Sequence, residues 1–513
     1  MASRFLILLI GVYASLLHAT ATGRAQQCSP AHLSSPSIPD SRILNLSAVP
    51  VTGYSVSSSS LDFCNVTITY THLGWNDTIH TTVYLPFEDW NGRFQAVGGG
   101  GWAASNGLVS LLEPVANGYA AGTTDAGHAL NSGSTASWYR NAQGNLNIHL
   151  LEDFASVALN DLGLFGQQVS RLFYGHGPRY SYWSGCSTGG RQGMMMAQRY
   201  PNTFDGIHAG APAINWDRFI VAEYWPQFVM NSLKHYPPPC VLSAITDAAV
   251  EACDNMDGVL DGVISAPDAC TFDPSSLIGK SVNCGHSNVS ISKQDAEIVR
   301  QSWRGPQRNG TQLWYGLYPG ADLSGLANTT CSSLSNCTGV PFEISSDWII
   351  RWVLNNPDAQ LTKLSLAGYT DIFESSIRQY HDIIGTSNPD LSAFKEAGGK
   401  MISWHGLADQ LIFPKGSEDY YTRVQALDPS VCDFFRFFEA PGVAHCGGGR
   451  GEIPVDPLEA VVSWVENGTA PDTLHAQSSD GQRERDLCLW PLVSVFKGGD
   501  PSKADSFVCE MQW

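Results

Sequence analysis

A single Gly-x-Ser-x-Gly pentapeptide, at residues 185–189, constrains the fold of this chain more than any other feature. It follows the aromatic run 179–184, which predicts a buried strand, and it precedes residues 192–200, which suit a helix that a proline ends. A serine between a strand and a helix, with glycine on both sides, can adopt strained backbone that exposes its hydroxyl group. The pattern therefore predicts a nucleophile elbow at Ser187, with an ordinary Gly-Ser turn as the alternative.

An acid and a base for this serine are expected further along the chain. A serine hydroxyl needs an imidazole to take its proton and a carboxylate to orient that imidazole. Asp409 follows a strand predicted at 400–404, and His445 follows a strand predicted at 433–438. The order serine, aspartate, histidine is that of α/β-hydrolases. Taken alone, the aspartate is more often a turn or helix cap and the histidine a surface or hydrogen-bonded residue. Weaker candidates for the base are His405 and His475.

Cysteines adjoin both the candidate nucleophile and the candidate base. Cys186 precedes Ser187, and Cys446 follows His445. A disulfide between them would hold the serine near the histidine, and catalysis falls steeply when a base is misplaced. It would close a loop of about 260 residues, for which loop entropy allows stabilisation on the order of 5 kcal/mol. The alternative is that Cys186 is a buried free thiol and that Cys446 pairs elsewhere.

A glycine run near the start of the chain is a candidate for the oxyanion hole. The tetrahedral intermediate of acyl transfer needs two hydrogen-bond donors aimed at its oxyanion. The backbone N–H of Thr188 is the expected first donor, and the second is expected from the run 98–101, at Gly100 or Gly101. Glycine-rich turns are common, so the run by itself does not select the donor.

The arrangement of predicted elements indicates an α/β fold in two parts. Predicted strands alternate with predicted helices, which is typical of a mostly parallel sheet. Between residues 215 and 390 the pattern changes to short aromatic stretches that include six of the thirteen cysteines. We interpret 22–214 and 391–513 as an α/β-hydrolase catalytic domain and 215–390 as a large inserted lid domain. The elements predicted before the elbow are a hairpin or meander at 67–86, strands at 93–97 and 119–125, and a helix at 148–165.

The composition and the first residues predict a secreted, extracellular protein. Residues 1–21 have a basic start, an apolar run and a small-residue end, as signal peptides do, and no second run is long enough to span a bilayer. Thirteen cysteines imply several disulfides and at least one cysteine left free or paired between chains. The net charge of −19 argues against nucleic acid and anionic membranes as partners. Eight sequons predict N-glycosylation, at Asn45, Asn65, Asn76, Asn288, Asn309, Asn328, Asn336 and Asn467.

The segment 253–263 combines three carboxylates with two glycines, so that side chains and backbone carbonyls could surround one cation. Oxygen ligands of this kind are those that Ca²⁺ prefers. The spacing is not that of an EF-hand, and the alternative is a pair of Asp-Gly turns with solvated carboxylates. Cys253 and Cys270 could close the loop as a disulfide. The expected ligands of this structural ion are Asp254, Asp257 and Asp261 with the carbonyls of Val259 and Val263.

Together these motifs resemble the tannase and feruloyl esterase family. The likeness spans residues 60 to 510, approximately. It implies an α/β-hydrolase with a lid inserted between nucleophile and acid, a Ser-Asp-His triad, a disulfide linking the cysteines beside Ser187 and His445, and calcium in the lid. The motifs that carry the likeness are Cys186-Ser187-Thr188-Gly189-Gly190-Arg191-Gln192-Gly193, His405-Gly406-x-x-Asp409, His445-Cys446 and Cys253-Asp254-x-x-Asp257-Gly258-Val259-x-Asp261-Gly262.

The resemblance also implies a substrate class. Members of the family hydrolyse esters of aromatic acids, either hydroxycinnamates on plant cell-wall polysaccharide or gallates in tannins, without an organic cofactor. The chain has no Lys-Arg or Arg-Arg pair at which its lid would be cut, which favours a feruloyl esterase that forms an acyl-enzyme on Ser187, with tannase as the alternative. A secreted serine peptidase and a non-catalytic wall-binding protein are alternatives from other classes. Four aromatic residues could either hold a phenolic ring or form the core of the lid: Trp216, Tyr224, Trp225 and Phe228.

Overall fold

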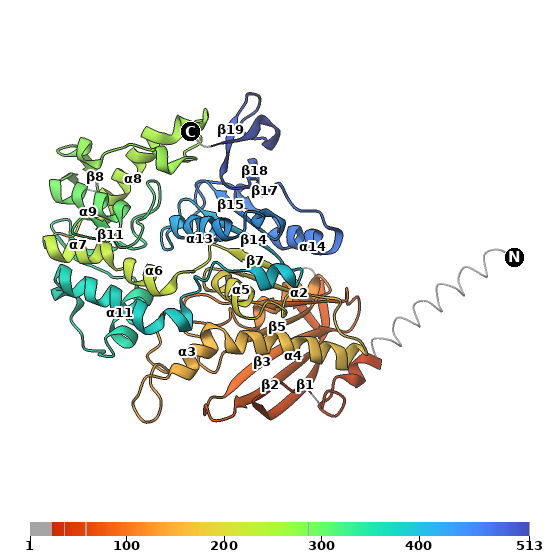
Figure 1. The fold of residues 1–513 in the computed structure, drawn as a ribbon. Helices are drawn as coiled ribbons and strands as arrows, with labels where there is room; N and C mark the ends of the chain where they lie inside the picture. The colour runs from red at the N-terminus through yellow and green to blue at the C-terminus, as the bar shows by residue number, and fades with distance from the viewer. Residues whose placement is uncertain (1–22, 35, 57–58, 286, 512–513) are drawn as a thin grey trace.

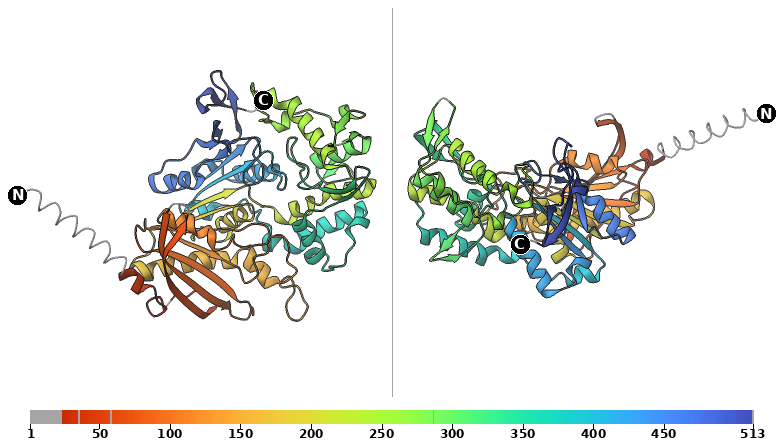
Figure 2. Two further views of the ribbon diagram at one scale, coloured as in Figure 1. Left: turned by 180° about the vertical axis from the view of Figure 1, so that it is seen from behind. Right: turned by 90° about the horizontal axis from the view of Figure 1, so that it is seen from above.

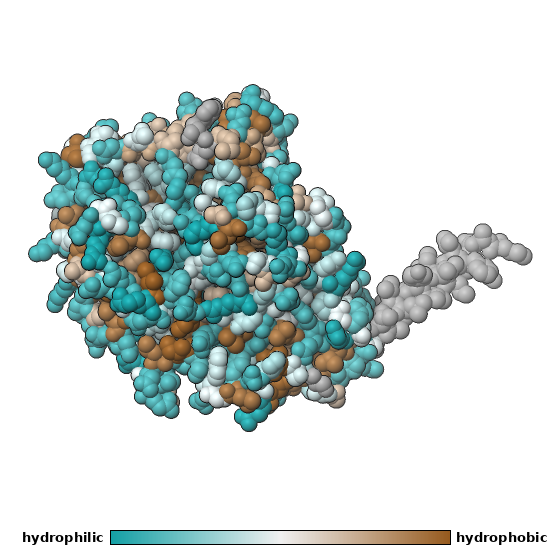
Figure 3. Space-filling view, in the orientation of Figure 1, coloured by the Kyte–Doolittle hydropathy of each residue, from teal (hydrophilic) through white to brown (hydrophobic). Residues whose placement is uncertain are grey.

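A computed structural model describes residues 23–34, 36–56, 59–285 and 287–511. The signal peptide expected at 1–21 lies outside the described residues. Among the helices that are described, none is long and apolar enough to cross a membrane. Hydrophilic side chains cover most of the face shown in Figure 3, with apolar side chains scattered among them.

A nine-stranded sheet forms the centre of the molecule (Figure 1). The three strand pairs from β1 to β5 are antiparallel, and the five pairs from β5 to β15 are parallel. The α/β-hydrolase class predicted from the sequence is confirmed. In sheet order the strands are β1 (Ser41–Val56), β2 (Ser59–His72), β3 (Ile79–Pro86), β5 (Ala120–Thr124), β4 (Arg93–Val97), β6 (Tyr180–Cys186), β7 (Gly206–Gly210), β14 (Lys400–Gly406) and β15 (Phe435–Ala440).

Helices cover both faces of this sheet, and each face has its own apolar core. Neighbouring residues of a strand point to opposite faces. Met401 accordingly belongs to the larger core, to which α4, α5 and α13 contribute, and Ile402 belongs to the smaller core under α14. Burial on both faces explains why these parallel strands show no strict alternation of apolar and polar residues. The helices of this part are α2 (Leu112–Ala116), α3 (Ile148–Ala155), α4 (Val157–Tyr174), α5 (Thr188–Arg199), α13 (Pro414–Leu427) and α14 (Pro457–Asn467).

The helix predicted at 148–165 is two helices, because a contact from far along the chain ends the first one. The backbone breaks at Ser156, where φ is −160° and ψ is −41°. The buried guanidinium of Arg191 donates to the carbonyl groups of Phe154 and Ala155, at 3.0 and 2.9 Å. These carbonyl groups lie in the last turn of α3, where orphan acceptors need an outside donor. The prediction of one continuous helix was therefore wrong.

The segment between β7 and β14 lies to one side of the sheet in Figures 1 and 2. Its short ladders do not join the nine-stranded sheet. The boundaries at 215 and 390 stay our interpretation: Asn215 precedes the first helix, and 390 falls between the last two. Its helices are α6 (Trp216–Ala222), α7 (Trp225–Leu233), α8 (Pro239–Cys253), α9 (Lys293–Arg304), α10 (Glu343–Asp347), α11 (Leu366–Ile384) and α12 (Ser392–Glu396), and its ladders pair β8 (Ser281–Asn283) with β9 (Asn288–Ser290), β10 (Gln307–Arg308) with β11 (Thr311–Gln312), and β12 (Thr329–Ser333) with β13 (Asn336–Gly339).

Six disulfides link twelve of the thirteen cysteines, and Cys432 is a free thiol. Two of the bridges are those expected from the sequence, Cys186–Cys446 and Cys253–Cys270. Another fastens the end of the chain, where small ladders are formed by β16 (Ile453–Pro454), β17 (Thr473–Gln477) and β18 (Glu484–Cys488), and by β19 (Leu492–Phe496) and β20 (Phe507–Met511).

Candidate active site

Ser187 occupies a sharp turn between β6 and α5. Its φ of 63° and ψ of −124° place it in left-handed backbone, which a residue other than glycine adopts only when its surroundings hold it there. The strand and the helix approach so closely that a Cβ on Gly185 would lie 2.6 Å from the carbonyl carbon of Gly189. Gly185 is thus needed for this approach, and a Cβ on Gly189 would lie 3.1 Å from the carbonyl oxygen of Gly99. The geometry is that of a nucleophile elbow.

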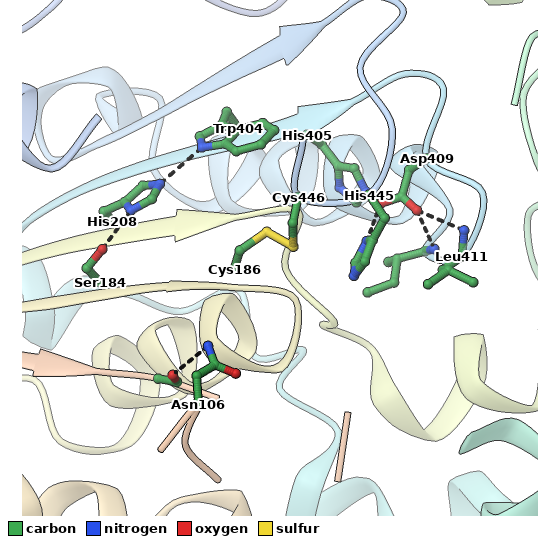
Figure 4. Close-up of a disulfide and its surroundings, with 12 residues drawn as sticks. Asn106, Ser184, Cys186, His208, Trp404, His405, Asp409, Leu411, His445 and Cys446 are labelled. Carbon is green, nitrogen blue, oxygen red and sulfur yellow. Dashed lines mark hydrogen bonds and ion pairs between the residues drawn. A yellow bond between two sulfur atoms is a disulfide. The ribbon is translucent and has the colours of Figure 1, made fainter. Parts of the chain in front are cut away.

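The candidate acid and base lie beyond the ends of the next strands of the parallel sheet. Asp409 follows β14 and His445 follows β15, so both extend from the same edge as the elbow. Nδ1 of His445 donates to Oδ2 of Asp409 at 2.7 Å (Figure 4). The Nδ1–H tautomer leaves Nε2 of His445 free to accept a proton.

The charges of this pair support each other. Burial opposes ionisation of Asp409, but the charge of His445 and the hydrogen bonds from both nearby imidazoles hold the pKa of this carboxyl well below its usual range. Burial likewise lowers the pKa of His445, but the negative charge of Asp409 and their hydrogen bond outweigh it and leave the pKa raised. A carboxylate that stays ionised can stabilise the imidazolium formed during acyl transfer.

His405 is not placed as a base. It is fully buried, its Nε2 donates to Asp409 Oδ2 at 3.1 Å, and its Nδ1 lies 2.8 Å from the hydroxyl of Ser417 on α13. It thus holds the acid from the side opposite the solvent. The His-Gly-x-x-Asp spacing was visible in the sequence, but only the fold shows that both residues face each other. The other weak candidate, His475, lies on β17 and pairs with Asp486 at 3.2 Å.

The disulfide Cys186–Cys446 joins the last residue of β6 to the loop that carries His445 (Figure 4). Its Cα atoms are 5.9 Å apart, although the two cysteines are separated by 260 positions. Cys446 has a φ of 60°, so the residue after the base, like the serine, has left-handed backbone. The bridge joins the residue before the serine to the residue after the base, and so restricts how far the base can move from the elbow.

Two backbone N–H groups are available for an oxyanion. Among the described residues, none accepts a hydrogen bond from the N–H of Thr188 or Gly101, whereas the N–H of Gly100 donates to the carbonyl of Ala103 at 3.1 Å. The hydroxyl of Thr188 donates to the carbonyl of Gly101 at 2.8 Å, which fixes the glycine run beside the elbow. This arrangement favours Thr188 with Gly101 and argues against Gly100, which the sequence alone could not separate from its neighbour.

A polar network behind the elbow was not foreseen from the sequence. Nε1 of Trp404 donates to Nε2 of His208 at 3.0 Å, and Nδ1 of His208 lies 3.0 Å from the hydroxyl of Ser184 (Figure 4). Burial lowers the pKa of His208 to about 4, so its imidazole is neutral. The network links β6, β7 and β14 beneath the site. A separate hydrogen bond supports the glycine run: the side-chain amide of Asn106 donates to the carbonyl of Gly98 at 3.4 Å.

A cavity of 440 Å³ opens over the candidate nucleophile, the base and the oxyanion donors. Ser187, His445 and the glycine run line one side of it, and the segment between β7 and β14 supplies a mainly apolar wall. Of the four aromatic residues singled out in the sequence, only Trp216 lines the cavity; Trp225 and Phe228 pack on Tyr369 instead. The wall consists of Trp216, Phe219, Ile220, Glu223, Phe342 and Ile344.

The expected calcium loop is ordered mainly by one carboxylate. Oδ1 of Asp254 accepts the backbone N–H groups of Asp261, Gly262 and Val263 at 3.0 to 3.2 Å. The disulfide Cys253–Cys270 closes the loop. The donor set is entirely oxygen, which fits a hard cation.

The other two carboxylates of this loop have protein partners. Asp257 accepts from the N–H of Val259 at 3.0 Å, and Asp261 lies 3.2 Å from a guanidinium nitrogen of Arg485. Within the described part of the chain, the ligand oxygens of these carboxylates do not gather within 4.8 Å of one another. Binding of an ion would therefore require these side chains to turn inward.

Comparison with known proteins identifies relatives over almost the whole chain. The family described as tannase and feruloyl esterase matches residues 64–510. A probable feruloyl esterase of Arthroderma benhamiae is 43% identical, with 89% of this chain and 87% of that protein aligned, and a tannase of Aspergillus oryzae is 31% identical over 86% and 84%. The solved structure of a tannin acyl hydrolase from Aspergillus niger superposes with a TM-score of 0.87, at 29% identity, over 95% of this chain and 96% of that one.

Proposed function

Because the chain belongs to the tannase and feruloyl esterase family, we propose that it hydrolyses esters of aromatic acids through an acyl-enzyme on Ser187. It is a carboxylic ester hydrolase, as its relatives are. One observation carries the proposal for the mechanism: a single cavity brings Ser187, His445 and two free N–H groups against an apolar wall. An apolar wall of this kind suits a planar aromatic acyl group.

The first half of the reaction acylates the serine. His445 Nε2 takes the proton from the hydroxyl of Ser187 as its oxygen attacks the ester carbonyl. The N–H groups of Thr188 and Gly101 receive the oxyanion, and Asp409 stabilises the imidazolium. The protonated His445 then gives its proton to the departing alcohol, and the aromatic acyl group remains on Ser187.

The second half releases the acid. His445 removes a proton from a water molecule that attacks the acyl-enzyme, the same two N–H groups stabilise the second oxyanion, and the proton passes to Ser187 as the ester bond breaks. The lid wall favours this step because it holds the acyl group while water enters. These steps need no organic cofactor.

Within the substrate class, we favour hydroxycinnamoyl esters of plant cell-wall polysaccharide over galloyl esters. The more similar of the two relatives in sequence, at 43% against 31% identity, is named a probable feruloyl esterase. Tannase activity is the second candidate, because the solved tannin acyl hydrolase matches the fold with a TM-score of 0.87.

The proposal is tested by the ratio of specific activities on methyl ferulate and methyl gallate. The purified protein is compared with its Ser187→Ala variant, which should fold and lose turnover by a factor on the order of 10⁶. Preference for ferulate supports the cell-wall activity, and preference for gallate supports a tannase. Retained hydrolysis by the variant would refute Ser187 as nucleophile, and inactivity of the unaltered protein on both esters would refute the substrate class.

Two further experiments separate the alternatives from other classes. Casein hydrolysis would favour a serine peptidase, and failure of Ser187 to react with a fluorophosphonate probe would favour a non-catalytic wall-binding protein.

We also propose that the protein is secreted and N-glycosylated. Six disulfides support an oxidising compartment, and the cysteine pairing within one chain leaves only Cys432 as a free thiol.

For the loop 253–263 we propose a structural Ca²⁺ ion. Asp254, Asp257 and Asp261 would supply carboxylates, and Val259 and Val263 would supply carbonyl oxygens. The support is the all-oxygen donor set on one disulfide-closed loop and a small cavity that Asp257 and Asp261 line together. A bound ion would stabilise the lid and would take no part in acyl transfer.

A further inference from the structure

One face of helix α6 forms much of the lid wall of the active-site cavity. Trp216, Phe219, Ile220 and Glu223 all line it, at helical positions i, i+3, i+4 and i+7. Residues with this spacing share one side of a helix. Three of the four are apolar, and the face ends at the carboxyl group of Glu223, directly after the last helical residue.

The carboxyl group of Glu223 is buried and lacks a partner. The residue is 2% exposed, its Oε2 atom is fully buried, and no hydrogen bond from the described residues reaches it. A buried carboxyl left without a partner destabilises the folded protein, because its desolvation is not compensated. Such a group is rare in a native protein unless a ligand, an ion or water completes its hydrogen bonds.

Several other polar groups around the cavity are already engaged. The amide of Asn106 donates to Gly98, the carbonyl of Ser132 accepts from Trp102, and the N–H groups of Leu411 and Ile412 donate to Asp409. Two buried side-chain atoms of the cavity lining have no partner among the described residues, Oε2 of Glu223 and Nε1 of Trp216. The indole can only donate a hydrogen bond, whereas the carboxyl group of Glu223 can also accept one.

The protonation state of Glu223 favours a neutral hydroxyl group as its ligand. Burial, with a smaller contribution from the negative charge of Asp409, raises the pKa of Glu223 well above its ordinary value. A neutral carboxylic acid can donate one hydrogen bond and accept another, as a phenolic hydroxyl can. A protonated acid has little attraction for a cation, so a metal ion does not match this position.

We propose that the carboxyl group of Glu223 hydrogen-bonds a ring hydroxyl of the aromatic acyl group and so selects phenolic over unsubstituted acids. The ring would lie on the apolar face of α6, with Trp216 and Phe219 beside it. The inference rests on the proposed function and deepens it, because it states which feature of the acyl group the enzyme recognises. Sites built to bind a hydroxyl group discriminate strongly against analogues without it, since their own polar group is then left unpaired.

The test compares esters that differ by ring hydroxyl groups. Values of kcat/KM are measured for methyl p-coumarate against methyl cinnamate, and for methyl gallate against methyl benzoate. Methyl esters carry no sugar hydroxyl, so any preference belongs to the acyl group. On the pair of esters that it hydrolyses faster, the unaltered enzyme should have a kcat/KM that is about tenfold or more higher for the phenolic ester.

Three variants test whether Glu223 causes this preference. Glu223→Leu removes the polar group at similar volume and should lower the phenolic preference by about tenfold, to near parity. Glu223→Gln keeps a donor and an acceptor and should keep the preference within about threefold. Asp153→Asn is the matched control, because Asp153 is also a buried carboxyl without a hydrogen-bond partner but lies outside the cavity, 3.6 Å from His72.

The outcomes distinguish this inference from the proposed function. Parity in the unaltered enzyme, or an equal loss on both esters of a pair in Glu223→Leu, would overturn the role of Glu223 while leaving the esterase activity in place. Should Glu223→Leu not fold, Glu223→Met replaces it, and the parity test on the unaltered enzyme still applies. Inactivity of the unaltered enzyme on all four esters would instead refute the substrate class.

Discussion

The Nε2 atom of His405 lies 3.1 Å from Oδ2 of Asp409, the same oxygen that accepts the hydrogen bond of His445. The second oxygen of Asp409 accepts the N–H groups of Leu411 and Ile412, at 2.8 and 2.9 Å. Four donors therefore hold one buried carboxylate. Its position, and through it the direction of the base, depends on a histidine that does not line the cavity.

His405→Gln should lower kcat about tenfold to a hundredfold with little change in KM. The loss of the buried imidazole lets Asp409 shift, and displacements of the order of 1 Å in a catalytic group have effects of this size. Steady-state kinetics on the preferred methyl ester provide the measurement. His475→Gln, at an exposed histidine that also pairs with an aspartate, should leave kcat unchanged. A rise in KM without a fall in kcat would exclude a positioning role for His405.

The acid limb of the pH profile should follow His445. Its pKa is raised above the ordinary value of 6.5, and the base acts in its neutral form, so kcat/KM should fall as the pH drops through a value above 6.5. Asp409→Asn removes the negative charge that raises this pKa. The variant should therefore show a midpoint at lower pH, with a rate reduced on the order of 10⁴-fold. An unchanged midpoint in the variant would show that another group controls the limb.

Removal of the bridge beside the triad should impair catalysis more than removal of a distant bridge. The Cys186→Ala/Cys446→Ala double variant should lose kcat and also unfold at lower denaturant concentration, because the bridge closes a long loop. The control is Cys488→Ala/Cys509→Ala, which removes a disulfide that closes a short loop near the end of the chain. Equal kcat values for the two double variants would mean that Cys186–Cys446 does not serve to position the base.

Calcium should raise the thermal stability of the protein without changing the chemical step. After treatment with EGTA, the Tm should fall and should recover on addition of Ca²⁺, because a ligand that binds only the folded state stabilises it. Asp257→Asn should weaken this recovery, whereas Asp322→Asn, at an exposed aspartate outside the loop, should not. If neither EGTA nor Ca²⁺ changed the Tm, the proposed Ca²⁺ site in the loop 253–263 would be refuted.

A buried histidine at the other end of the sheet should make stability depend on pH. His72 lies between Asp77 and Asp161, at 2.6 and 2.9 Å. Burial lowers its pKa, but the hydrogen bonds with Asp161 and Asp77 and the charges of Asp153 and Asp161 raise it from 6.5 to about 10. A raised histidine pKa contributes stability that is complete below pH 6.5 and is lost as the pH rises through 10. The contribution is on the order of 5 kcal/mol at most.

Denaturant unfolding at pH 6 and pH 9 checks this expectation. The free energy of unfolding should fall between the two pH values in the unaltered protein, and this fall should be smaller in His72→Gln, which should also be less stable at pH 6. His475→Gln is again the control, because its imidazole is exposed. A pH dependence that is the same in both variants would contradict the ion-pair role of His72.

Local sequence was sufficient where neighbouring residues determine the backbone. The strand, the glycines and the helix around Ser187 are contiguous, and the structure has β6 and α5 at that place, although α5 begins at Thr188 rather than 192. The loops of Asp409 and His445 follow apolar runs that are buried on both faces of the sheet, so their positions after β14 and β15 could be foreseen as well. Strand β1 was missed because its exposed and half-buried residues show no regular alternation.

The remaining features depend on contacts between distant parts of the chain, which no local pattern contains. Arg191 ends a helix that lies 36 positions earlier, and a hydrogen bond to Ala103 removes Gly100 rather than Gly101 from the oxyanion hole. The sequence by itself determined which residue types could perform acyl transfer and in what order they occur. Only the tertiary structure decided which of them meet, because the cavity forms between α6 and residues that follow β4, β6 and β15, which are far apart in the sequence.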